Sequence, residues 1–167
     1  SGLPVVMGIF NVTPDSFSDG GRFITPATVE AQVLNMLASG VDIIDVGGES
    51  TRPGAEKVTL TEELERVIPV IEWITDRFDT VVSVDTYKAE VMQEAVNCGA
   101  KIINDVNALR DEGAVEIAVK SGVSVCLMHK RGDFSTMHNS PVYEDVLFEV
   151  RCFLLEQAHR CQALGLA

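Results

Sequence analysis

Short apolar runs alternate along the chain with longer segments in which apolar residues recur every three or four positions. Such runs, bounded by polar or turn-forming residues, predict buried parallel strands, because other elements cover both faces of these strands. Gly40, Gly99 and Gly122 each precede a run directly and fit the left-handed position just past a helix end. The predicted strands lie at residues 5–10, 41–45, 81–84, 100–105 and 123–129.

The segments between the runs have the periodicity of amphipathic helices. Thr59 and Glu62 have the spacing of a capping box, and Pro69 is expected to kink the helix that they begin. Five strand–helix units in succession predict a right-handed parallel α/β fold. The apolar helix positions are Val29, Val33, Met36 and Leu37; Leu64, Val67, Ile68, Ile71 and Ile74; Val91, Ala95 and Cys98; Ala114, Ile117 and Ala118; and Val150, Phe153, Leu154 and Ala158 within residues 146–163.

Two architectures compete: an open doubly wound sheet and a (β/α)8 TIM barrel. The ends of the predicted strands are polar, namely Asn11, Asp45, Asp85, Asn104 and His129. Strand ends converge on one site in a barrel, whereas distant strands of an open sheet need no polar ends. No Gly-rich nucleotide-binding pattern follows any strand. Because a full barrel needs about 250 residues, we expect residues 1–167 to be a single incomplete barrel domain of five units, ending before strand 6.

The chain has 167 residues, 46% of them hydrophobic, and a net charge of −12. This composition predicts a globular domain that disfavours nucleic acid and anionic membranes. No run approaches the roughly 20 apolar residues of a membrane span, and the N-terminus has no targeting pattern. The cysteines lack a C-x-x-C pair and predict buried, non-catalytic free thiols in a reducing, cytoplasmic compartment. They are Cys98, Cys126, Cys152 and Cys161.

Two polar loops that follow the first two predicted strands are candidates for a binding site. Residues 11–21 (NVTPDSFSDGG) are rich in turn formers, and Asn11 could either cap its own loop or ligate Mg²⁺ that holds phosphate oxygens. Residues 47–54 (GGESTRPG) offer hydroxyls, flexible glycine backbone and Arg52, which can grip phosphate through paired donors. Two such loops at neighbouring strand ends favour an anion, or a metal-bound anion, as the ligand.

Further candidates end the later strands, and each has an alternative structural role. Asp85 could accept hydrogen bonds from an aminopyrimidine-type edge or cap the following helix. Asn104 and Asp105 could bind a heterocycle or cap a loop. Met128 could pack against a ring, and His129 is expected to be structural rather than catalytic.

The chain resembles the dihydropteroate synthase family over nearly its whole length. Residues 7–21 (MGIFNVTPDSFSDGG) resemble the family's first signature, and residues 44–55 (IDVGGESTRPGA) resemble its second. Residues 82–86 (VSVDT), 103–106 (INDV) and 127–129 (LMH) are similar to further family segments in the same order. The first two motifs are long and specific.

The resemblance implies a (β/α)8 barrel transferase of folate biosynthesis, of the kind targeted by sulfonamides. Such enzymes join 6-hydroxymethyl-7,8-dihydropterin diphosphate to p-aminobenzoate, giving 7,8-dihydropteroate and diphosphate. The residue roles that it implies are Asn11 for Mg²⁺ carrying the diphosphate; Asp85 and Asn104 for the pterin's aminopyrimidine edge; Met128 and Val106 for the walls of the pterin slot; Thr51 and Arg52 for contact with the diphosphate or closure over the site; and Phe17, Thr51 and Pro53 for the p-aminobenzoate pocket.

The implied chemistry needs no covalent nucleophile from the protein, and none is expected. Diphosphate leaves from a CH₂ group attached to an electron-rich pterin, which can stabilise a cation. Mg²⁺ and cationic donors therefore have to neutralise the leaving group. A positioned aromatic amine then supplies the nucleophile.

The resemblance also implies that several functional groups lie beyond Ala167: a further pterin-binding Asp, a Lys and an Arg-x-His anion site. We therefore expect residues 1–167 alone to have little or no synthase activity, and their open sheet edges predict a homodimer or a swapped assembly. Two alternatives remain open, a pterin-binding methyltransferase domain and a non-catalytic half-barrel. The two polar loops favour the synthase over the methyltransferase, because a methyl carrier needs no diphosphate site.

Overall fold

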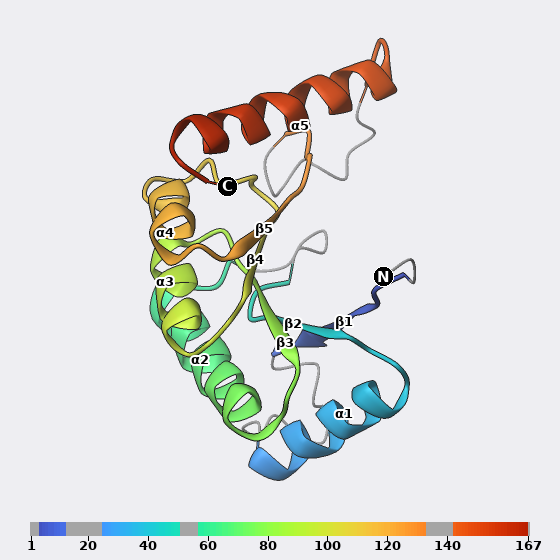
Figure 1. The fold of residues 1–167 in the computed structure, drawn as a ribbon, viewed down its shortest axis with the longest axis vertical. Helices are drawn as coiled ribbons and strands as arrows, with labels where there is room; N and C mark the ends of the chain where they lie inside the picture. The colour runs from blue at the N-terminus through green and yellow to red at the C-terminus, as the bar shows by residue number, and fades with distance from the viewer. Residues whose placement is uncertain (1–3, 13–24, 51–56, 133–141, 167) are drawn as a thin grey trace.

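The computed structural model describes residues 4–12, 25–50, 57–132 and 142–166. They form one parallel sheet in which each strand pairs with the next one in sequence. A doubly wound sheet would reverse its strand order at a switch point, so the consecutive order confirms an incomplete barrel (Figure 1). The strands are β1 (Met7–Asn11), β2 (Ile43–Gly47), β3 (Val81–Asp85), β4 (Ile102–Asp105) and β5 (Ser124–Leu127).

Five helices alternate with these strands and run around the outside of the curved sheet (Figure 1). The predicted capping box is confirmed, since Thr59 N–H donates to Glu62 Oε2 at 3.0 Å and Thr59 Oγ1 accepts from Glu62 N–H at 3.3 Å. None of the helices in the described ranges is long and apolar enough to cross a membrane. The helices are α1 (Pro26–Ala38), α2 (Leu60–Arg77), which continues through Pro69, α3 (Ala89–Asn97), α4 (Ala114–Ser121) and α5 (Val146–Ala163).

The core lies between the outer face of the sheet and the helices. Alternate residues of each strand point to this side, and the apolar stripes predicted for the helices cover them. The glycines predicted just past the helix ends, Gly40, Gly99 and Gly122, all have positive φ, as expected. The fully buried core residues include Phe10, Ile44, Val46, Val82, Val84 and Ile103 from the strands and Val33, Val67, Ile71, Ile74, Val91 and Ala95 from the helices.

The first strand differs from its prediction in both bounds and burial. It spans Met7–Asn11, not residues 5–10, and Val5 and Ile9 are 63% and 67% exposed. Strand β1 is an edge strand, and Ile9 projects to the inner face of the sheet, where no described segment covers it. A buried strand was therefore the wrong interpretation of this apolar run.

Two further predictions from the sequence are wrong. Asp45 lies in the middle of β2 and not at its end, because the strand continues to Gly47. The cysteines are not uniformly buried, since Cys126 and Cys152 are exposed and Cys161 is buried. Cys126 is exposed because it occupies an inner-face position of β5.

Candidate active site

One row of register partners crosses all five strands near their carboxyl ends. Asn11 lies beside Gly47, Gly47 beside Asp85, Asp85 beside Asn104, and Asn104 beside Cys126. Register partners project to the same face of a sheet, and their chain neighbours such as Phe10 and Val84 face the helices. The fold therefore brings three of the predicted site residues together on the inner face: Asn11, Asp85 and Asn104.

Asn104 is oriented by a side chain from β2. Its Nδ2 donates a 3.0 Å hydrogen bond to Oδ2 of Asp45, which lies 59 residues earlier in the sequence. Asp45 is 4% exposed and lies two residues before Gly47, so it also faces the inner side. Because this bond fixes the amide, the Oδ1 of Asn104 is available to accept from a ligand. Within the described ranges, Oδ1 of Asp45 has no hydrogen-bond partner, which leaves a buried acceptor beside the row.

Asp85 ends β3 and is half-buried. Burial, followed by the negative charges of Asp45 and of other nearby carboxylates, raises its pKa from 3.8 to about 7. A carboxyl group with this pKa donates or accepts hydrogen bonds at neutral pH, which suits a heterocycle edge that carries both kinds of group. A Cβ at Gly47 would lie 3.3 Å from Oδ2 of Asp85, so glycine keeps this space open. The alternative role of Asp85 as a helix cap is wrong, because Lys88 is the N-cap of α3.

Asp105, by contrast, has the structural role that the sequence left open for it. It is fully buried on the outer face, and its two carboxylate oxygens each accept a 2.7 Å hydrogen bond, from Asn107 N–H and from Leu109 N–H. Burial raises its pKa to about 6. These bonds support a turn in which Ala108 and Leu109 have positive φ, a conformation that is uncommon outside glycine. Asp105 therefore shapes the loop and is not a site residue.

The remaining candidates after β4 and β5 differ in exposure. Val106 is 6% exposed and Met128 is 43% exposed. Met128 follows Cys126 by two positions and so has the inner-face orientation that contact with a flat ring requires. His129 packs against aromatic rings, with centroid distances of 5.0 Å to Phe153 and 6.0 Å to Tyr143, in line with the expected structural role.

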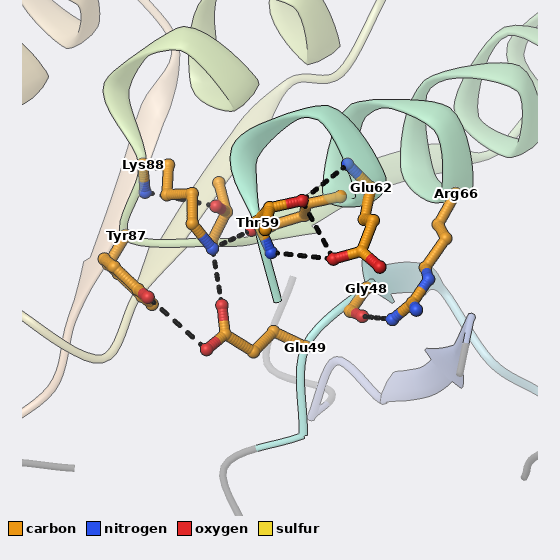
Figure 2. Close-up of polar contacts among 9 residues, drawn as sticks. Gly48, Glu49, Thr59, Glu62, Arg66, Tyr87 and Lys88 are labelled. Carbon is orange, nitrogen blue, oxygen red and sulfur yellow. Dashed lines mark hydrogen bonds and ion pairs between the residues drawn. The ribbon is translucent and has the colours of Figure 1, made fainter. Parts of the chain in front are cut away.

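The start of the loop after β2 is held by the polar network that Figure 2 shows. Lys88 Nζ, from the loop after β3, lies 2.5 Å from Glu49 Oε2 and also forms an ion pair with Glu63 of α2. The side chains of Lys88, Glu49 and Glu63 are only 14%, 13% and 1% exposed. The Tyr87 hydroxyl donates a 3.3 Å hydrogen bond to Glu49 Oε1.

Gly47, the last residue of β2, and Gly48, the first residue of the loop, are both buried, so the prediction of flexible backbone is wrong for them. A Cβ on Gly48 would lie only 2.6 Å from Cγ2 of Val67 in α2. The carbonyl oxygen of Gly48 accepts a 3.2 Å hydrogen bond from Arg66 of the same helix. Glycine is needed here for close approach to α2 and not for mobility.

Four predicted site residues lie outside the described residues: Phe17, Thr51, Arg52 and Pro53. The sequence reasoning also missed two features. The inner-face position of Asp45 could have been found from side-chain alternation along β2, which puts it on the same face as Gly47. No local pattern pointed to the contact of Lys88 with two carboxylates, because the three residues come from distant segments.

The fold and the arrangement of the site are those of a known protein family. Residues 7–167 match the family model described as "Pterin binding enzyme". The chain therefore belongs to the pterin-binding enzyme family.

Within that family, the chain is similar to dihydropteroate synthases. It is 51% identical over 164 residues to the Escherichia coli (strain K12) enzyme. It also matches the Yersinia pestis enzyme in a sulfonamide drug complex, with a TM-score of 0.91, 48% identity and coverage of 98% of this chain and 60% of that one. For the Xanthomonas albilineans enzyme with 4-aminobenzoic acid, the TM-score is 0.89 at 50% identity, and the coverage is 98% and 58%. The alignment with the Escherichia coli enzyme covers 98% of this chain and 58% of that relative's length.

Proposed function

We propose that residues 1–167 form the pterin-facing part of a dihydropteroate synthase, which joins 6-hydroxymethyl-7,8-dihydropterin diphosphate to p-aminobenzoate and releases diphosphate. The observation that supports it is the row that sets Asn11, Asp85 and Asn104 on one face near the strand ends. Relatives that carry this name are about half identical to the chain, which supports the same reaction class. Because the chain spans 58% of the length of such a relative, we expect residues 1–167 alone to turn over little or no substrate.

Asp85 and Asn104 are proposed to recognise the aminopyrimidine edge of the pterin. The ionised carboxylate of Asp85 would accept from two neighbouring N–H groups, and Oδ1 of Asn104 would accept from a third. Asp45 would keep the Asn104 amide in the orientation that exposes this oxygen, through the 3.0 Å bond between them. Met128 and Val106 would enclose the flat faces of the ring.

A magnesium ion is proposed at Asn11. Within the described ranges there is no cluster of three or more His, Cys, Asp and Glu residues that could hold a metal by themselves. Mg²⁺ commonly takes one or two protein ligands and completes its shell with substrate phosphates and water. Asn11 is exposed at the end of β1 and supplies a neutral amide oxygen. The ion would neutralise charge that develops on the departing diphosphate.

The rest of the reaction would depend on how the protein positions the two substrates. Thr51 and Arg52 are proposed to contact the diphosphate, and Phe17, Thr51 and Pro53 to shape the pocket that aims the amine of p-aminobenzoate at the pterin CH₂ group. No protein nucleophile is needed. A homodimer or swapped assembly and a cytoplasmic location also stay predictions.

The test is an assay of dihydropteroate formation by a full-length synthase that carries residues 1–167, either the native gene product or a fusion to the C-terminal part of the Escherichia coli relative. We expect product formation that depends on Mg²⁺ and falls strongly in Asn11→Ala. Pterin binding without any product would refute the synthase and favour the methyltransferase domain or the non-catalytic half-barrel. Residues 1–167 assayed alone provide the comparison for the expected loss of turnover.

A further inference from the structure

Cys126 belongs to the row that carries the proposed pterin contacts, although its sequence context indicated no role for it. It is the register partner of Asn104 in the pairing of β4 with β5, so its thiol projects to the same inner face. Exposure along β5 alternates as this orientation requires, because Cys126 is exposed whereas its neighbours Val125 and Leu127 are partly buried against the core. The thiol is therefore open to the space in front of the row, beside the amide assigned to the ligand.

A buried carboxylate reaches toward the same space from β2. The strand register puts Asp45 beside Ser83, but its Oδ2 accepts from Asn104, so the carboxylate extends past β3 toward β4. Asp45 is 4% exposed, and within the described ranges its Oδ1 has no hydrogen-bond partner. A buried acceptor is costly when it is left without a donor. The inner face beside Asn104 therefore has the chemistry of a binding site, with an unmet acceptor on one side and an exposed thiol on the other.

The electrostatic surroundings of the thiol agree with this position near the two aspartates. Partial burial of the sulfur, followed by the negative charges of Asp45 and then of Asp85, raises the pKa of Cys126. At neutral pH the side chain is therefore almost entirely the neutral thiol, which is a weak S–H donor with a polarisable sulfur. These properties favour contact with a neutral heterocycle over nucleophilic catalysis.

We propose that Cys126 is a contact residue of the pterin site: its thiol lies against the bound heterocycle, so pterin binding and chemical modification of this thiol exclude each other. The inference rests on the proposed function, which assigns Asp85 and Asn104 to the aminopyrimidine edge and Met128 to the ring. Cys126 has one of these contacts on either side, Asn104 across the strand pairing and Met128 two residues along the same face of the chain. Thiol-directed electrophiles small enough to enter the site should therefore block it.

The test measures how fast iodoacetamide alkylates each cysteine of the full-length synthase described above, with and without 6-hydroxymethylpterin. The thiol loses its proton to solvent, the thiolate displaces iodide, and an S–C bond forms; a pH of about 8.5 supplies enough thiolate. Mass spectrometry of the peptides gives a rate for each thiol. With pterin at about ten times its Kd, the free site and hence the rate at Cys126 should fall roughly tenfold. Cys152 is the matched control, because it is exposed on α5 outside the sheet, and its rate should stay within about twofold.

The converse experiment asks whether the modified thiol keeps the pterin out. After alkylation, the Kd of 6-hydroxymethylpterin measured by calorimetry should rise at least roughly tenfold, because the added group occupies the contact. Cys126→Ala lacks the reactive sulfur, so the same treatment should change the Kd of this variant less than about twofold. The inference is overturned, and the proposed function left intact, if Cys126 does not react in the free protein, if its alkylation is undiminished in the pterin complex, or if treated Cys126→Ala loses affinity as the wild type does. An untreated wild type that binds no pterin would instead refute the proposed pterin site, and this inference with it.

Discussion

Replacing Asp85 by Asn should make the free protein more stable while removing its proposed pterin binding. The side chain is half-buried at the end of β3, and its carboxyl group has a pKa of about 7 against an ordinary value of 3.8. Asparagine has nearly the same shape and carries no charge. The variant therefore measures how much the ionisable carboxyl group at this position lowers the free energy of unfolding when no ligand is bound.

The size and sign of the effect follow from the two pKa values. Because the folded pKa is raised above the unfolded value, the stability that the protonated carboxyl contributes is complete below pH 3.8 and is lost as the pH rises through about 7. One pKa unit corresponds to about 1.4 kcal/mol. Ionisation of this carboxyl, which occurs at lower pH in the unfolded chain than in the folded protein, should thus lower the free energy of unfolding by about 2 kcal/mol at pH 5 and by about 4 kcal/mol at pH 8.

Urea unfolding of the wild type and of Asp85→Asn at pH 5 and pH 8 measures this difference. We expect the variant to be more stable at both pH values and its advantage to be larger at pH 8. Calorimetry at pH 8 should show that the variant binds 6-hydroxymethylpterin at least about tenfold more weakly, because the charged acceptor is gone. A stability advantage that is absent, or equal at the two pH values, would refute the raised pKa of Asp85.

Three other substitutions test single contacts. Asp45→Ala removes the acceptor that orients Asn104, so pterin affinity measured by calorimetry should fall roughly tenfold; an unchanged Kd would contradict the positioning role of this bond. Gly48→Ala puts a Cβ 2.6 Å from Val67 and should lower the free energy of unfolding in urea by about 1–3 kcal/mol; an unaltered midpoint would show that α2 adjusts freely. Asp105→Asn loses one of two backbone hydrogen bonds at a fully buried site, and thermal unfolding should show a loss of about 1–3 kcal/mol; wild-type stability would disprove the support of the turn.

The elements of the fold could be predicted because their signals are local. Helical periodicity, the capping box at Thr59 and the glycines past the helix ends depend on residues close in sequence. The strand ends at Asn11 and Asp85 were likewise visible as polar residues after apolar runs. The burial of β1 could not be predicted, because an apolar run does not reveal whether its strand lies at the edge of a sheet. The bond between Asp45 and Asn104 was also beyond sequence reasoning, since it joins strands 59 residues apart whose register is set by the whole sheet.

The order of the strands has a consequence for how the chain assembles. Each strand from β2 to β5 pairs with the strand synthesised just before it. A polypeptide emerging from the ribosome can therefore dock each strand–helix unit onto an edge that is already present, without waiting for a distant partner. The edge exposed at each stage is a template for the next strand, and a pause in translation would prolong its availability to other chains.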